Sequence, residues 1–108
     1  VIHAVKAANT IIGVHTDLAA TRPWAIHGFR GKPTVAQMYL RAGLWLSFGE
    51  RFNPDALRAM PRDRILAETD DSQLTIQQIL ALQARALGIP ATEYTAMIAA
   101  NTARFLGI

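Results

Sequence analysis

Short apolar runs alternate with longer amphipathic stretches along this chain, and that alternation restricts its fold more than any other property of the sequence. Runs of strand length fall at Val1–Val5, Trp24–Phe29, Leu44–Phe48 and Arg64–Thr69. Helices are predicted at Ala8–Ala20, Thr34–Ala42, a short segment from Pro54, Thr75–Leu87 and Ala91–Phe105. The order β-α-β-α-β-α-β-α-α is typical of α/β folds with parallel strands and right-handed crossovers. Four such strands form either a small open sheet or half of an eight-stranded barrel, and periodicity alone does not separate the two.

Residues with capping chemistry mark the expected helix boundaries. Asn53 is expected to cap the short helix, while Thr34 and Thr92 are the expected N-caps of the helix before it and of the last helix. Glycines that follow the last apolar position of a helix, Gly43 and Gly88, predict helix ends there.

Length and composition indicate one small globular unit. The 108 residues, of which 51% are hydrophobic and 18% charged, suffice for a single domain over residues 1–108. No apolar run approaches the roughly 18 residues of a membrane span, so no membrane association is expected. The absence of cysteine excludes a thiolate metal site and suits a reducing, cytoplasmic compartment. Because Val1 already lies in a strand-like run, we expect further sequence upstream of it.

Three polar side chains fall within or at the end of strand-like runs. His3 interrupts the first run, His27 the second, and Asp70 follows the fourth. Active sites of parallel α/β sheets and barrels form at the carboxyl ends of the strands, where side chains from different strands converge. Two imidazoles and a carboxylate suit a hydrolytic divalent metal such as Zn, Mn or Mg, which lowers the pKa of bound water.

The same residues have structural interpretations. A single histidine in a strand is more often a hydrogen-bonded core residue than a ligand, and an acid after a strand often caps the next helix. Glu68, two positions before Asp70, is expected on the same side of the strand, where it orients a ligand or pairs with a basic group. His15 lies within Ala8–Ala20 and is expected on the surface. The pattern alone leaves the metal site and the structural interpretation open.

Basic residues also follow the strand ends. Arg30 and Lys32 come after the second run, where a guanidinium and an ammonium group suit contacts with phosphate. The net charge of +3 is compatible with an anionic substrate, and equally with ordinary surface charge.

Several segments resemble one protein family. In chain order, the sequence contains VIHAVKA, IHGFRG, LWLSFG, RILAETDDS and NTARFLGI. These segments are similar to those of the TatD-type deoxyribonucleases, and the resemblance runs over essentially the whole chain. It implies the C-terminal half of a TIM-type (β/α)8 barrel of the metallo-dependent hydrolase superfamily, comprising the last four βα units and a C-terminal helix.

The resemblance also implies a chemistry. The family hydrolyses phosphodiesters, typically in DNA, with a divalent metal ion (Zn, Mg or Mn) that activates water. Carried over, His3, His27 and Asp70 match its metal ligands, and Asp70 is also the candidate catalytic proton acceptor. Arg30 and Lys32 are then the candidate substrate-binding residues.

Two family features have no counterpart in this chain, namely the H-x-H pair of the first strand and the bridging glutamate of a middle strand. A complete barrel also needs about 250 residues. We therefore expect these 108 residues alone to hydrolyse DNA poorly, and to pair with the missing N-terminal half or to self-associate through exposed strand edges. The alternatives are a non-catalytic half-barrel, an interaction module, or a basic nucleic-acid-binding module without chemistry.

Overall fold

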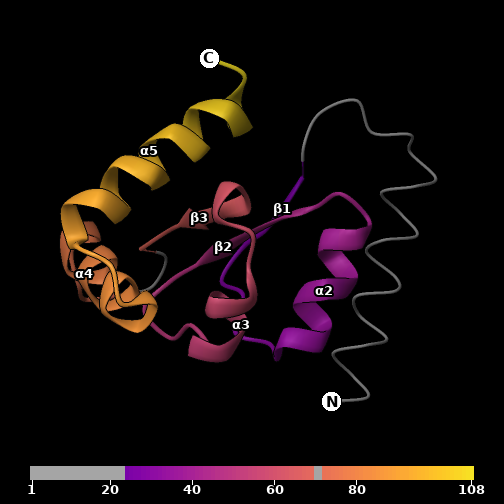
Figure 1. The fold of residues 1–108 in the computed structure, drawn as a ribbon, viewed down its shortest axis with the longest axis horizontal. Coiled ribbons are helices and arrows are strands. Elements are labelled where there is room, and N and C mark those ends of the chain that lie inside the picture. Colours follow the sequence, from indigo (N-terminus) through magenta and orange to yellow (C-terminus); the bar gives the residue numbers. More distant parts are fainter. Residues whose placement is uncertain (1–23, 70–71) are drawn as a thin grey trace.

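The computed structural model describes residues 24–69 and 72–108 of the chain. Its elements alternate as the sequence predicts (Figure 1). They are β1 (Ala25–Ile26), α2 (Pro33–Arg41), β2 (Trp45–Phe48), α3 (Pro54–Ala59), the 3-10 turn η1 (Arg62–Arg64), β3 (Ile65–Ala67), α4 (Ile76–Leu87) and α5 (Ala91–Leu106). The strand predicted at Val1–Val5 and the helix predicted at Ala8–Ala20 lie outside the described residues. None of the helices described is long and apolar enough to cross a membrane.

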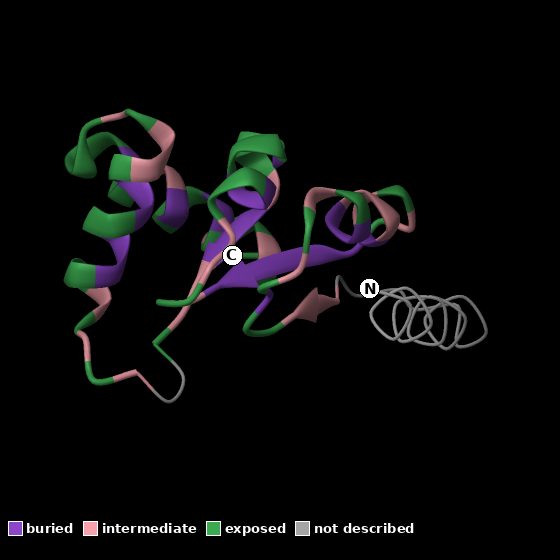
Figure 2. Ribbon diagram, turned by 90° about the horizontal axis from the view of Figure 1, so that it is seen from below, coloured by how far each residue is buried: buried purple, intermediate pink, exposed green. Residues whose placement is uncertain are grey.

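The described strands form a parallel sheet in the order β1-β2-β3, which confirms the predicted α/β class. Ala25 lies opposite Trp45, and Leu46 lies opposite Ile65. Figure 2 shows the described helices gathered on one side of this sheet. Every residue of β2 is buried, as expected for the central strand of a parallel sheet.

Aromatic side chains form the centre of the core between the sheet and the helices. The Phe29 ring meets the rings of Tyr39 and Phe48 edge-to-face, at centroid distances of 6.1 and 5.7 Å. These edge-to-face contacts connect the segment after β1 with α2 and β2. The core therefore holds the loop that follows β1 firmly against the sheet.

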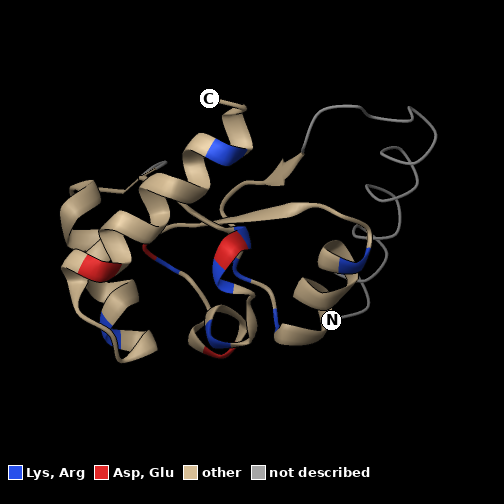
Figure 3. Cartoon of the chain, turned by 45° about the horizontal axis from the view of Figure 1, so that its top comes forward, with Lys and Arg blue, Asp and Glu red and all other residues tan. Residues whose placement is uncertain are grey.

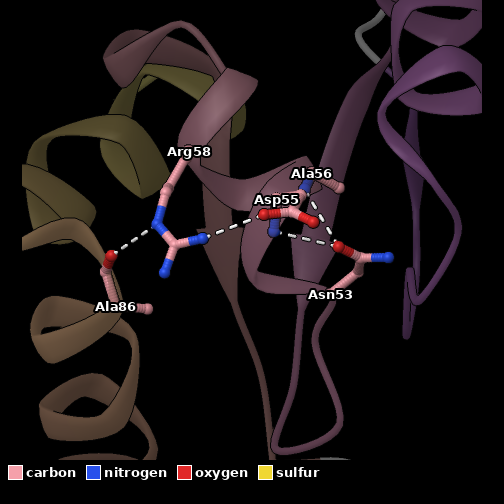
Figure 4. Close-up of polar contacts among 5 residues, drawn as sticks. All are labelled: Asn53, Asp55, Ala56, Arg58 and Ala86. Carbon is pink, nitrogen blue, oxygen red and sulfur yellow. Dashed lines mark hydrogen bonds and ion pairs between the residues drawn. The ribbon is translucent and has the colours of Figure 1, made fainter.

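The predicted cap of the short helix α3 is confirmed. The Asn53 side-chain oxygen accepts hydrogen bonds from the backbone N–H groups of Asp55 and Ala56, at 2.9 and 3.1 Å (Figure 4). Arg58 then connects α3 to α4, because its Nε donates to the Ala86 carbonyl at 3.0 Å while Nη1 pairs with Asp55 at 3.0 Å.

Two of the predicted N-caps are wrong. Helix α2 begins at Pro33 with Lys32 as its N-cap, so Thr34 lies inside the first turn. Proline favours the first helical position because its φ is preset and its missing N–H is not needed there. Helix α5 likewise begins one residue before Thr92, with Pro90 at the N-cap position and no side-chain cap. The predicted end at Gly88 is confirmed, since this residue adopts a left-handed conformation with φ of 71°.

A buried polar network holds the carboxyl end of β2. Gln83 of α4 is fully buried, and its amide group donates to the carbonyls of Phe48 and Gly49 at 2.9 and 3.2 Å. The Tyr94 hydroxyl donates to the Gln83 side-chain oxygen at 2.6 Å. Both outer helices therefore anchor the point at which β2 ends and its following loop begins.

Asn101 of α5 does the same for β3. Its buried amide group donates to the carbonyls of Arg62 and Ile65 at 2.8 and 2.9 Å. Arg104 donates to the Asn101 side-chain oxygen and to the Asp63 carbonyl. The C-terminal segment NTARFLGI thus fixes the turn that leads into β3.

We expect the chain to lose stability at alkaline pH through Tyr94. Burial raises the pKa of its phenol well above the usual value of about 10, and the positive charge of Arg62 opposes this only in part. A raised folded-state pKa means that the neutral phenol stabilises the fold below pH ~10, and that this contribution is lost as the pH rises further. Urea unfolding between about pH 8 and pH 11 should show the decline, and Tyr94→Phe should flatten it. An unchanged slope in Tyr94→Phe would assign the alkaline loss to other groups.

Candidate active site at the carboxyl edge of the sheet

The carboxyl ends of the parallel strands open onto one pocket. β1 is followed by His27 and Gly28, β2 by Gly49, and β3 by Glu68. The pocket has a volume of about 160 Å³. It is lined by Gly28, Arg30, Gly49, Glu50, Arg51, Glu68 and Ser72.

Glu68 is the most enclosed charged group of this pocket, with a side chain only 12% exposed. Its backbone N–H donates to the Phe48 carbonyl at 3.1 Å, which extends the pairing of β3 with β2 by one residue. Its Oε1 accepts a hydrogen bond from the Gly28 N–H at 2.8 Å and lies 3.5 Å from His27 Nδ1. The carboxylate thus reaches across the end of β2 to the turn that follows β1.

The turn after β1 requires glycine at position 28. Gly28 has a φ of 61°, a left-handed conformation that costs other residues roughly 1–2 kcal/mol. A Cβ there would meet Glu68 Oε2 only at 3.9 Å, which is ordinary contact. The backbone conformation, and not a lack of space, therefore selects glycine, and it brings the Gly28 N–H to the carboxylate.

A second carboxylate connects the loops that follow β2 and β3. Glu50 accepts a hydrogen bond from the Ser72 hydroxyl at 2.7 Å. Ser72 is itself held by its backbone N–H, which donates to the Thr69 carbonyl at 2.8 Å, and its hydroxyl accepts from the Leu74 N–H at 3.0 Å. Glu50 therefore closes one side of the pocket, a role that the sequence did not reveal.

Two arginines from different loops also line the pocket. Arg30 follows β1 and Arg51 follows β2, and both are exposed. Within residues 24–69 and 72–108, neither is part of an ion pair or a side-chain hydrogen bond, whereas Arg58 and Arg104 elsewhere are bound to acceptors. Figure 3 shows that basic and acidic residues are interspersed along the described chain. The pair of guanidinium groups gives this pocket the capacity to bind an anion.

The predicted site residues fall into three groups in the structure. Arg30 lines the pocket, and His27 lies beside it in contact with the pocket carboxylate Glu68. Lys32 is the N-cap of α2 and is not among the lining residues. His3 and Asp70 lie outside the described residues.

The described donors are chemically suited to a divalent metal but do not complete a site. His27 is 74% exposed, and with Nδ1 directed at Glu68 its Nε2 is free to bind an ion. Among residues 24–69 and 72–108, no group of three or more His, Cys, Asp or Glu is placed to hold one. The other two predicted ligands, His3 and Asp70, lie outside these residues.

A family model for TatD-related DNases matches residues 1–107 of the chain. The chain belongs to this family. Among solved structures, the TatD-related chain is similar to a hydrolase TatD family protein from Entamoeba histolytica, with a TM-score of 0.79 and 12% identity over 93% of this chain and 48% of that one. It is also similar to YJJV, a TatD homolog from Escherichia coli K12, with a TM-score of 0.79 and 20% identity over 94% of this chain and 47% of that one. No curated protein matches it.

These comparisons confirm the predicted fold class. The TatD-related chain spans about half the length of the solved structures that it matches. Its parallel sheet, with the described helices on one side, is therefore half of a TIM-type barrel. In such a barrel the carboxyl edge of the strands carries the active site, which is the edge where the pocket lies.

Sequence reasoning missed four pocket residues of this TatD-related chain. Gly49, Glu50, Arg51 and Ser72 all lie in loops after β2 and β3. The one available signal was position, because each follows a strand end within a few residues.

Proposed function

We propose that this chain supplies half of the active site of a divalent-metal-dependent phosphodiesterase acting on DNA or a related substrate. The observation that carries the proposal is the pocket at the carboxyl edge of the half-barrel, with the accessible His27 imidazole beside it. The pocket combines two carboxylates with two guanidinium groups that form no ion pair within the described part of the chain. Membership of the TatD-related DNase family supports the same chemistry.

In this proposal His27, His3 and Asp70 hold the ion. The ion, when bound, lowers the pKa of a coordinated water so that hydroxide is available near neutral pH. Asp70 is the candidate proton acceptor during attack on phosphorus. Glu68 stays outside the ligand set, because its Oε1 already accepts the Gly28 N–H.

Arg30 and Arg51 bind the phosphate group in this proposal. A guanidinium offers parallel N–H donors that match two phosphate oxygens, and two of them from different loops place positive charge on both sides of a bound anion. Lys32, which is exposed on the segment before α2, contributes a longer-range positive charge. Glu50 and Glu68 would repel an isolated phosphate group, because all three are negatively charged. They therefore favour a phosphate that binds together with a cation.

Binding of a short single-stranded DNA, measured by fluorescence anisotropy with Mn²⁺ present, tests the phosphate contacts. Binding is the appropriate readout because the chain lacks the H-x-H pair and the bridging glutamate, so little cleavage is expected from it alone. We expect Arg30→Ala with Arg51→Ala to weaken binding and to reduce the salt-dependence slope by about 1.4, since each phosphate contact on single strands contributes about 0.7. Arg41→Ala, on an exposed arginine in the last turn of α2, is the matched control and should leave the slope unchanged.

The same titration separates the proposal from a nucleic-acid-binding module without chemistry. A metal-dependent site predicts that EDTA weakens binding and that Mn²⁺ restores it. Binding that ignores EDTA but falls steeply with salt would favour the module without chemistry. Equal slopes for the double variant and for Arg41→Ala would remove Arg30 and Arg51 from the substrate site.

A further inference from the structure

We infer that Glu68 is a positioning residue, whose carboxylate holds the His27 imidazole by Nδ1 and leaves Nε2 as the atom that binds an ion. The presentation of Nε2 to a metal rests on the proposed function. The hold on the ring itself rests only on contacts between described residues.

The carboxylate is placed independently of the histidine. Glu68 Oε1 is fixed by the Gly28 N–H at 2.8 Å, a backbone donor whose position follows from the left-handed turn at Gly28. The Glu68 side chain is 12% exposed, whereas that of His27 is 74% exposed. The more enclosed and anchored carboxylate is therefore the fixed partner, and the exposed ring adjusts to it.

The distance between Glu68 Oε1 and His27 Nδ1 is 3.5 Å, slightly longer than a hydrogen bond. A small rotation of the exposed ring would bring the two atoms into hydrogen-bonding range. Contacts in sites of this kind are often long without the ligand and tighten when it binds. An ionised carboxylate accepts hydrogen bonds and donates none, so the nitrogen that faces it carries the proton in neutral histidine. Nδ1 is then protonated and Nε2 keeps its lone pair.

This arrangement is the usual support for a metal-binding histidine. Such a histidine commonly donates its second ring N–H to a carboxylate, which fixes both the tautomer and the orientation of the ring. Here the carboxylate comes from the end of β3 and the histidine from the end of β1, so the contact spans the intervening strand β2. The two strand ends are thereby coupled at the edge where the pocket lies.

The other pocket carboxylate provides a matched control. Glu50 also lines the pocket, but its described hydrogen-bond partner is the Ser72 hydroxyl at 2.7 Å. Glu50→Gln therefore removes the same charge from the same pocket without removing the partner of His27.

The ring nitrogens of His27 report the tautomer directly by ¹⁵N NMR of the full chain, without metal, at about pH 8.5, well above the usual histidine pKa of about 6.5. The chain has three histidines, so the His27 signals are identified by their loss in His27→Ala. We expect the Nδ1–H tautomer to predominate in the unaltered chain and in Glu50→Gln, and to lose its predominance in Glu68→Ala. Glu68→Gln keeps an acceptor for Nδ1 and for Gly28, and should retain part of the preference.

Zn²⁺ affinity, measured by competition with a chromogenic chelator, is the second readout. Loss of such an outer carboxylate typically weakens metal binding by about 10–100-fold. We expect that loss in Glu68→Ala and a smaller one in Glu50→Gln, which removes the same charge but keeps the partner of His27. The same tautomer in Glu68→Ala as in the unaltered chain would overturn the inference. If Glu68→Ala does not fold, a preference for Nδ1–H in Glu68→Gln that is as strong as in the unaltered chain overturns it. A tautomer that depends on Glu68 in a chain without Zn²⁺ affinity would overturn the proposed function and leave the hold of Glu68 on His27 standing.

Discussion

Replacing Tyr94 with alanine is expected to lower the free energy of unfolding by about 3–5 kcal/mol, the range for deleting a large buried aromatic ring. Tyr94 has no exposed surface and belongs to the core between the sheet and the helices. Its removal creates a cavity and also leaves the buried Gln83 oxygen without the hydroxyl that now donates to it. Urea unfolding followed by circular dichroism measures the change.

Two further variants separate the ring from the hydroxyl. Tyr94→Phe keeps the ring and removes only the donor to Gln83, so we expect a loss of about 1–3 kcal/mol. Thr95→Ala, at the neighbouring exposed position, removes a hydroxyl that donates to the Ala91 carbonyl and should change stability by less than about 0.5 kcal/mol. A loss in Tyr94→Ala no larger than that in Thr95→Ala would contradict the description of α5 as part of the core.

The alternation of elements was predictable because each described strand is short and apolar, and because the helices between the strands begin or end at residues that favour those positions. Asn53 is an example, since its side chain accepts hydrogen bonds from the backbone N–H groups two and three residues further along the chain. Such a contact is local and can be predicted from sequence. Thr34 and Thr92 show where local preference is insufficient. In both cases a proline upstream already starts the helix, and the threonine that resembled a cap lies inside its first turn.

Gln83 could not be recognised from helical periodicity. An amide on an amphipathic helix is ordinarily assigned to the solvent side, yet Gln83 is fully buried. Its amide donates to the Gly49 carbonyl where β2 ends, and adds a second hydrogen bond to the Phe48 carbonyl, which also accepts from the Glu68 N–H. Such a contact depends on three-dimensional packing between segments 34 residues apart in the chain.

The candidate site was predictable to the extent that it depends on strand ends. The rule that side chains converge at the carboxyl edge of a parallel sheet predicts the positions that the structure shows for Arg30 and Glu68 in the pocket and for His27 beside it, whereas their roles stay predictions. The contributions of Arg51 and Ser72 depend on how the loops after β2 and β3 fold back, and side-chain periodicity contains no information on that. The contact of Lys32 with substrate stays a prediction, since this residue is the N-cap of α2 and is not among the lining residues.

Replacing His27 with alanine is expected to lower the affinity of the chain for Zn²⁺ by at least ~100-fold, because losing a direct ligand costs more than the 10–100-fold loss typical of an outer residue. Chelator competition measures this affinity, with His15→Ala as a control that removes a histidine not assigned to the site.

The stability of His27→Ala shows whether His27 is a metal ligand or a structural histidine. The side chain is 74% exposed, so His27→Ala should change the free energy of unfolding by no more than about 0.5 kcal/mol. A structural histidine would behave in the opposite way, with stability lost and Zn²⁺ affinity unchanged. Loss of metal affinity at constant stability would therefore assign His27 to the ion, whereas equal affinities in the His27 and His15 variants would remove it from the site. Because Glu68 is anchored to the Gly28 N–H and not to the ring, its carboxylate should keep its position in His27→Ala, so the variant tests the imidazole alone.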